Sequence, residues 1–275
     1  MYASEIPAQL RDFAAETVQA AAQLIRQRRG ELIEVNTKSS NVDPVTEVDT
    51  AAEEFIAQRI REARPQDGIL GEEGADKASE SGVQWIVDPI DGTVNFLYGI
   101  PEYAVSIGAA IDGELVAGAV INVARDRLYM AALGHGAEVR QGNDAHALRC
   151  RTNPDPATCL VATGFSYLAS RRVQQAQLLV ELLPQVRDIR RMGAAALDLC
   201  RVAEGSVDIY YEHGINPWDF AAGAVIAREA GAEVSHPGFD SRAADGDLVW
   251  AASAAASSRW QEVMTGVDLL TPLRS

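Results

Sequence analysis

Residues 85–93 read Trp85-Ile86-Val87-Asp88-Pro89-Ile90-Asp91-Gly92-Thr93. An apolar run, predicted to be a strand, ends in two carboxylates three positions apart, Asp88 and Asp91. Because proline favours an extended conformation in the residue before it, we expect the strand to deliver Asp88 to a rim rather than bury it. Gly92 lets the backbone approach an anion closely, and Thr93 offers a hydroxyl and the start of a helix. The segment therefore predicts a phosphate site in which carboxylates share hard cations such as Mg²⁺.

The composition is that of a folded globular protein with a substantial core. Of its 275 residues, 47% are hydrophobic and 23% are charged. The formal net charge of −15 argues against nucleic acid or an anionic membrane as the main partner, because both are negatively charged and attract basic surfaces. An acidic protein that acts on phosphate needs bound divalent cations, which invert the local electrostatic field. Most of the other carboxylates are interpreted as solvated surface.

Cysteine usage and the N-terminus indicate a cytoplasmic protein. The three cysteines, Cys150, Cys159 and Cys200, are scattered and odd in number, which fits neither a disulfide framework nor a CxxC metal site. The first residues lack the basic-then-apolar pattern of a signal segment, and no apolar run reaches the length of a membrane span. We therefore expect a soluble protein of the cytoplasm.

Hydrophobic periodicity divides the chain into two parts that meet near residues 150–158. The first part begins with two amphipathic helices and continues with strands, two of them joined by the hairpin signal Asp112-Gly113. The second part alternates strands and helices. Helices are expected at 7–30, 44–64, 170–183, 194–203, 217–230 and 258–265, and strands at 69–70, 85–88, 103–111, 115–123, 128–133, 137–140, 160–163, 188–191, 207–211, 232–235 and 248–251. The pattern predicts an N-terminal α+β lobe, residues 1–150, and a C-terminal α/β lobe, residues 151–275, that completes the site.

Further acidic residues stand where predicted elements begin or end, which is where open α/β sheets place ligand sites. Glu72 and Glu73 lie between two glycines after a short apolar strand, and Asp219 lies in the first turn of a helix. Singly, each has an ordinary explanation: an exposed acidic turn, or a carboxylate that complements a helix dipole. For Asp49, within the second helix, the ordinary explanation is a solvated helix face. Together these carboxylates would repel one another severely unless cations neutralised them, and all-oxygen donors favour two or more Mg²⁺ ions.

These motifs resemble those of the inositol monophosphatase family of Mg²⁺-dependent sugar-phosphate phosphatases. The matching segments are Asp43-Pro44-Val45-Thr46-x-x-Asp49, Gly71-Glu72-Glu73, Trp85-x-x-Asp88-Pro89-Ile90-Asp91-Gly92-Thr93-x-Asn95-Phe96, Trp218-Asp219-x-Ala221-Ala222-Gly223 and Gly231-Ala232. The resemblance covers nearly the whole chain, and it is strongest to the bacterial SuhB-type inositol-1-monophosphatases, especially those of actinobacteria. It implies an α+β fold, a layered αβαβα sandwich of the type shared by inositol monophosphatase and fructose-1,6-bisphosphatase.

The resemblance also implies how the cations are held. One metal ion would be bound by Glu72, Asp88 and the backbone carbonyl of Ile90. A second would be bound by Asp88, Asp91 and Asp219. A third, weaker ion would lie near Glu72 with waters, so the family pattern implies two or three Mg²⁺ ions in each site.

Catalytic and substrate-binding roles follow from the same resemblance. Asp49 and Thr93 would orient the attacking water with the assistance of Glu72, and Lys38 would lie on a loop near the metals. Gly92 and Thr93 would cradle the phosphate. The implied substrate-binding set is Asp91, Gly92, Thr93, Ala195, Glu212 and Asp219. One segment departs from the family, because Gly193-Ala194-Ala195-Ala196 lacks the hydroxyl residue that usually follows the glycine.

The implied reaction is hydrolysis of myo-inositol monophosphate to myo-inositol and phosphate by a metal-activated water. Glu212 favours a polyol, because a carboxylate accepts hydrogen bonds from vicinal hydroxyls. Fructose 1,6-bisphosphate, histidinol phosphate, nucleotide 3′-phosphates and NADP are alternative substrates. The sequence shows no obvious basic cluster near the motifs, which argues against a bisphosphate substrate. Arg190 and Arg191 are interpreted as a solvated face. A regulatory binding protein on the same fold is the alternative from another class. The family also implies a homodimer and inhibition by lithium.

Overall fold

The computed structural model of the protein describes residues 5–29, 35–37, 44–153 and 155–274. A seven-stranded sheet is built from β3 (Gly68–Gly71), β4 (Val83–Asp91), β5 (Ala104–Ile111), β6 (Glu114–Asn122), β7 (Arg127–Ala132), β8 (Ala137–Gln141) and β9 (Asp144–Ala147). Its strands lie side by side in the order in which they occur in the chain, and all neighbours are antiparallel except β3 and β4, which are parallel.

A second sheet has five strands and a mixed arrangement. Its strands are β10 (Leu160–Thr163), β11 (Asp188–Arg190), β12 (Ile209–His213), β13 (Ala232–Ser235) and β14 (Leu248–Ser253). Their order is β11-β10-β12-β14-β13, and β10 is parallel to both of its neighbours. A separate antiparallel ribbon pairs β1 (Val35–Thr37) with β2 (Pro44–Thr46).

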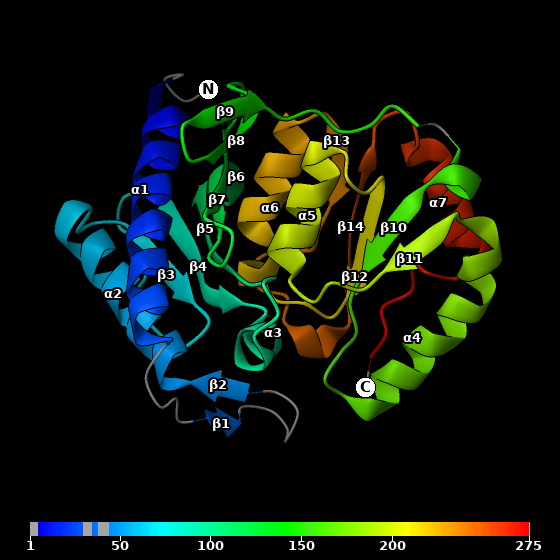
Figure 1. The fold of residues 1–275 in the computed structure, drawn as a ribbon, viewed down its shortest axis with the longest axis horizontal. Helices are drawn as coiled ribbons and strands as arrows, with labels where there is room; N and C mark the ends of the chain where they lie inside the picture. The colour runs from blue at the N-terminus through cyan, green and yellow to red at the C-terminus, as the bar shows by residue number, and fades with distance from the viewer. Residues whose placement is uncertain (1–4, 30–34, 38–43, 154, 275) are drawn as a thin grey trace.

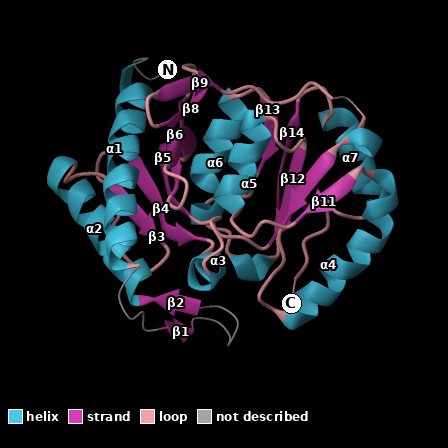
Figure 2. Cartoon of the chain, in the orientation of Figure 1, coloured by secondary structure: helices cyan, strands magenta, loops and turns pink. Residues whose placement is uncertain are grey.

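Helices cover the outer faces of both sheets and fill the space between them (Figures 1 and 2). They are α1 (Glu5–Arg28), α2 (Glu47–Ala63), α3 (Thr93–Tyr98), α4 (Ala169–Leu182), α5 (Ala195–Glu204), α6 (Pro217–Glu229) and α7 (Ser257–Gly266). The pair α1 and α2 covers the larger sheet, α5 and α6 lie between the sheets, and α4 and α7 cover the smaller sheet. The five layers form the predicted αβαβα sandwich, which confirms the fold class. The proposed division into two lobes at residue 150 stays a prediction. In the described residues, no helix is long and apolar enough to cross a membrane.

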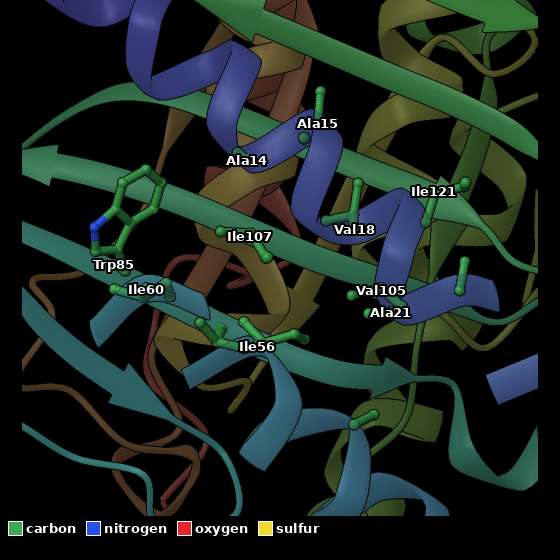
Figure 3. Close-up of a cluster of buried hydrophobic side chains, with 14 of the residues drawn as sticks. Ala14, Ala15, Val18, Ala21, Ile56, Ile60, Trp85, Val105, Ile107 and Ile121 are labelled. Carbon is green, nitrogen blue, oxygen red and sulfur yellow. The ribbon is translucent and has the colours of Figure 1, made fainter. Parts of the chain in front are cut away.

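Apolar side chains on one face of each outer helix form the core beneath it. Along α1 the buried residues recur every three or four positions, as in Ala14, Val18 and Ala21, so a single stripe of the helix faces the sheet. The stripe packs on Ile107 of β5 and Ile121 of β6, as Figure 3 shows. Small alanines in the stripe let the helix axis lie close to the strands.

The central helix α6 approaches the larger sheet unusually closely because two glycines face it. Gly108 on β5 and Gly118 on β6 are register partners in the sheet. A Cβ atom added at Gly108 would lie 2.9 Å from the Cβ of Ala221, and one at Gly118 would lie 2.6 Å from the carbonyl oxygen of Ala222. Only glycine permits this contact. The close packing holds the first turn of α6, which carries Asp219, against the sheet.

Several predicted boundaries shift for identifiable reasons. The second helix begins at Glu47 rather than near residue 44. Thr46 has an extended backbone, and its hydroxyl oxygen accepts the N–H groups of Val48 (3.2 Å) and Asp49 (3.3 Å), which caps the helix. The strand β9 is absent from the sequence prediction because all four of its side chains are exposed, so no alternating pattern marks it.

Two local predictions are confirmed. Asp112 and Gly113 join β5 to β6 with positive φ angles of 50° and 85°, as a tight hairpin turn requires. A helix begins at Thr93, preceded by Gly92 in the left-handed conformation. Lys38 and Asp43, which the family resemblance singles out, lie outside the described residues.

Candidate active site

Three carboxylates converge where the end of β4 meets the first turn of α6. One oxygen from each of Asp88, Asp91 and Asp219 lies within 4.8 Å of the others. Within the described part of the chain, no other three His, Cys, Asp or Glu side chains bring ligand atoms so close together. The expectation that Asp88 lies at a rim is wrong, since it is only 1% exposed. Pairing between β4 and β5 becomes irregular between Asp88 and Asp91 but resumes there, so β4 continues past Pro89 beneath the helices of the middle layer.

Burial and mutual repulsion raise the pKa of each of these carboxyl groups. Burial is the largest cause at Asp88, and the neighbouring charges of Glu72, Asp91 and Asp219 raise the pKa further. Burial likewise raises the pKa of Asp219 well above its usual range, with Glu72 and Asp91 adding to the effect. The pKa of Asp91 rises to about 7, again mainly through burial. Oδ1 of Asp88 is buried without a hydrogen-bond partner. An unsatisfied buried oxygen among like charges fits a cation site, because one cation would both bind that oxygen as a ligand and neutralise the repelling charges.

Glu72 adjoins this group from the end of β3. Its N–H donates to the carbonyl oxygen of Val87 (3.3 Å), which places the residue beside β4. Its carboxyl group hydrogen-bonds with that of Asp88. Glu72 is half-buried and stands outside the three-carboxylate group itself. The structure therefore brings the predicted acidic metal ligands to one place, and their role as ligands stays a prediction.

Asp49 and Thr93 form a buried pair on the other side of β4. The Thr93 hydroxyl lies 3.1 Å from Oδ1 of Asp49 and 3.0 Å from the carbonyl oxygen of Ile90. Asp49 is fully buried in the first turn of α2, where it also accepts the N–H of Thr46 at 3.0 Å. Burial raises its pKa to about 6, and the charge of Glu72 contributes. A hydroxyl that donates to Asp49 directs its lone pairs elsewhere, which suits it to orient a water molecule.

The start of α5 is tied to β4 through Asp91. Its two carboxylate oxygens accept the N–H groups of Ala195 (3.1 Å) and Ala196 (2.8 Å). The next residue, Gly92, has φ of +90°, and a Cβ there would lie 2.9 Å from the carbonyl oxygen of Glu102. No other residue fits this turn without rearrangement. Because the Ala195 N–H is used by Asp91, the expected contact between this backbone and inositol stays a prediction.

Glu212 extends the site from β12 of the smaller sheet. The Tyr210 hydroxyl donates to its Oε2 at 3.0 Å, and burial raises its pKa to about 7. A Cβ at Gly164 would collide with this carboxylate at 2.1 Å, so the glycine provides the space that Glu212 occupies. The exposed Arg191 lowers the pKa of Glu212, so a cation stands near the site where the sequence indicated only solvated charge. Its neighbour Arg190 pairs with Asp188 on the surface, as a solvated face would.

Comparison with known proteins identifies the family. The sequence pattern of the inositol monophosphatase family matches residues 7–266. The chain belongs to the inositol monophosphatase family. It is 49% identical over 243 residues to the inositol-1-monophosphatase SuhB of Mycobacterium tuberculosis, covering 83% of this chain and 84% of that protein.

Two further relatives define the branch of the family. The solved structure of Mycobacterium tuberculosis SuhB superimposes with a TM-score of 0.84 at 45% identity, covering 96% of this chain and 99% of that one. A protein of Escherichia coli named Nus factor SuhB is 40% identical over 205 residues, covering 74% of this chain and 75% of that protein. The SuhB-type assignment made from the motifs is thereby confirmed.

Some supporting residues of this family member escaped sequence-based reasoning. Asn95 donates to the carbonyl oxygens of Glu102 (2.7 Å) and Met192 (2.8 Å), which ties α3 to the segment before α5. Glu53, on α2, binds the turn that carries Glu72. Asn95 stands within a matched motif, which was a usable signal. Glu53 had none, because its place four residues after Asp49 looks like an ordinary helical position.

Proposed function

We propose that this family member is a Mg²⁺-dependent phosphatase that hydrolyses myo-inositol monophosphate to myo-inositol and phosphate. The observation that carries the proposal is the convergence, within 4.8 Å, of oxygens from the buried Asp88 and Asp91 and the half-buried Asp219. A phosphate ester is an anion, so a site lined by carboxylates binds it only through cations. The name inositol-1-monophosphatase, carried by the mycobacterial relatives, supports the choice of substrate.

The donor set fits Mg²⁺ because every donor is an oxygen. In the proposal, Glu72, Asp88 and the carbonyl of Ile90 hold one ion, and Asp88, Asp91 and Asp219 hold a second. A third and weaker ion lies near Glu72. When bound, Mg²⁺ supplies charge neutralisation for the phosphoryl oxygens and lowers the pKa of water.

The chain's own residues orient the reactants. The Thr93 hydroxyl, held by Asp49 at 3.1 Å, orients the attacking water with the assistance of Glu72. Gly92 and Thr93 line the phosphate position. Glu212, Asp91, Asp219 and the backbone at Ala195 meet the inositol hydroxyls. Glu212 suits vicinal hydroxyls because an ionised carboxylate accepts two hydrogen bonds.

A substrate comparison with the full-length protein tests the proposal. Phosphate release is measured with Mg²⁺ on inositol 1-phosphate, fructose 1,6-bisphosphate, histidinol phosphate, a nucleotide 3′-phosphate and NADP. We expect the highest kcat/KM on inositol 1-phosphate and no turnover after treatment with EDTA. A kcat/KM for another of these compounds far above that for inositol 1-phosphate would change the assigned substrate but not the assigned reaction, phosphate-ester hydrolysis. Arg191 makes this comparison more important, since a cation near Glu212 favours a second anionic group.

A regulatory binding function is the second candidate, and the name Nus factor SuhB of relatives 40–42% identical favours it. In this alternative the fold presents a binding surface for a partner, and the acidic site does not need to hydrolyse any phosphate ester. The same assay separates the two candidates. Absence of turnover on every substrate in the presence of Mg²⁺ favours the regulatory function.

Three further properties belong to the proposal through the family. We expect a homodimer, a cytoplasmic location and inhibition of phosphate release by lithium. Light scattering on the purified protein measures the first, and a lithium titration at fixed Mg²⁺ measures the last. A monomeric mass at working concentration would remove the dimer from the proposal.

A further inference from the structure

A buried glutamate outside the proposed catalytic set supports the turn that carries Glu72. Glu53 lies on α2, four residues after Asp49, and is 2% exposed. The ion pairs of the described residues include none to Glu53. A buried carboxylate without a paired cation must be satisfied by other donors. The nature of those donors indicates what Glu53 does.

Both oxygens of Glu53 bind the backbone of the Gly71–Ala75 turn. Oε2 accepts the N–H of Glu73 at 2.8 Å, and Oε1 accepts the N–H of Ala75 at 2.8 Å. The bonded N–H groups belong to the first and third residues after Glu72. Hydrogen bonds to an ionised acceptor are about twice as strong as those between neutral groups. The turn is therefore clamped from α2 immediately after the residue proposed to bind a cation.

Gly71 completes the clamp from the other side of Glu72. A Cβ added at Gly71 would lie 2.7 Å from Oε2 of Glu53 and 2.8 Å from its Oε1. The backbone of Gly71 therefore rests directly on the carboxylate, and no side chain fits between them. Glu53 thus contacts the backbone on both sides of Glu72.

We propose that Glu53 is a positioning residue that sets where Glu72 presents its carboxylate to the cation. The inference rests on the proposed function, since it assigns Glu72 to a metal ion. One rigid helix then controls two parts of the site. Its residue 49 holds the Thr93 hydroxyl, and its residue 53, about 6 Å further along at 1.5 Å per residue, holds the Glu72 turn. The spacing between the proposed cation ligand and the proposed water-orienting hydroxyl is fixed by α2.

Glu53→Gln tests the proposal with a near-isosteric side chain. A neutral amide has one acceptor oxygen, so its NH₂ group faces one of the two backbone N–H donors and releases part of the turn. We expect binding of Mg²⁺ alone, measured by calorimetry on the full-length protein, to weaken about tenfold. At saturating Mg²⁺, kcat should return to within a few-fold of the wild type. Glu54→Gln is the matched control, because Glu54 is exposed on the same helix.

A double-mutant cycle tests the Gly71 contact independently, including the case in which Glu53→Gln does not fold. Gly71→Ala in the wild type should weaken Mg²⁺ binding, because the new Cβ displaces the carboxylate. In the Glu53→Ala background the same substitution should have little further effect, since the atoms it strikes are gone. Equal losses in both backgrounds would overturn the proposal.

The remaining outcomes separate this inference from the proposed function. A lower Tm for Glu53→Gln with an unchanged Mg²⁺ affinity would assign Glu53 a merely structural role and overturn the inference alone. A wild-type protein that binds no Mg²⁺ would overturn both the inference and the proposed function. Weaker Mg²⁺ binding in Glu53→Gln but not in Glu54→Gln supports the positioning role.

Discussion

Two buried aspartates are associated with the same nine-residue strand, β4: Asp88 belongs to the strand, and Asp67 hydrogen-bonds to it, and only Asp67 has its hydrogen-bonding capacity well satisfied. Asp67 is 3% exposed and Asp88 is 1% exposed. Asp67 accepts hydrogen bonds from Trp85 Nε1 (2.9 Å) and the Ser81 hydroxyl (2.7 Å), and it pairs with Arg64. Asp88, three residues after Trp85, has an oxygen without any partner and faces other carboxylates.

The two aspartates show that a charge can be buried for two reasons: to stabilise the fold, as at Asp67, or to bind a ligand, as proposed for Asp88. Asp67 has enough donors from the chain itself, so its burial stabilises the native arrangement. Asp88 has too few, and its neighbours repel it, so its burial is unfavourable until cations arrive. The same substitution, aspartate to asparagine, should therefore have opposite effects on stability at the two positions.

Asp88→Asn should produce the largest effect. It removes a ligand proposed to be shared by two ions, so we expect kcat/KM on inositol 1-phosphate to fall by at least about 10³-fold, or about 4 kcal/mol. In EDTA the variant should melt above the wild type, because one repelling charge is gone. Phosphate release and a thermal melt measure the two effects. Near-normal turnover would contradict the assignment of Asp88 as a metal ligand.

Thr93→Val should reduce the rate without loosening the cations. Valine matches threonine in shape but cannot donate to Asp49 or orient a water, so kcat should fall about 100-fold. The Mg²⁺ concentration for half-maximal rate should change little. Thr93→Ser, which keeps the hydroxyl, is the control and should retain most of the activity. A loss in the serine variant equal to that in the valine variant would argue against the hydroxyl.

Asp67→Asn should be destabilising where Asp88→Asn is not. The neutral amide weakens the bonds from Trp85 and Arg64, which costs about 1–2 kcal/mol. At roughly 2–4 °C for each kcal/mol, Tm should fall by about 2–8 °C. Activity per folded molecule should stay near that of the wild type. An unchanged Tm would show that Asp67, despite its hydrogen bonds, contributes no more to the stability of the fold than Asp88.

The metal-free protein should lose stability between about pH 4 and pH 7. Burial raises the folded-state pKa of Asp91 and of Glu212 to about 7, above the unfolded values near 4. Each group binds its proton more tightly when folded, so its contribution is fully present below the unfolded pKa and lost as pH rises through the folded pKa. Melts in EDTA should give a lower Tm at pH 8 than at pH 5, and Mg²⁺ should abolish the difference at pH 8. A higher Tm at pH 8 than at pH 5 in EDTA would show that the acidic site is not the destabilising element.

Local patterns in the sequence predicted much of the architecture. The stripe of α1, the Asp112-Gly113 hairpin and the start of α3 at Thr93 follow from periodicity, turn chemistry and helix signals within a few residues of each other. Predictions failed where no local pattern exists. The exposed β9 shows no alternation, and the start of α2 depends on hydrogen bonds that the Thr46 hydroxyl accepts from Val48 and Asp49 rather than on hydrophobicity.

The sequence by itself determined which side chains are available for chemistry: Asp88 and Asp91 at fixed spacing on one strand, and a family pattern that includes Asp219. Only the tertiary structure decided how these groups are held, because burial, repulsion and backbone donors arise from elements distant in the chain. Folding buries Asp88 beneath α6, brings Arg191 near Glu212, and places Glu53 under the Glu72 turn. The sequence alone does not distinguish an aspartate whose oxygens find hydrogen-bond donors within the fold, such as Asp67, from one that lacks them and requires a cation, as proposed for Asp88.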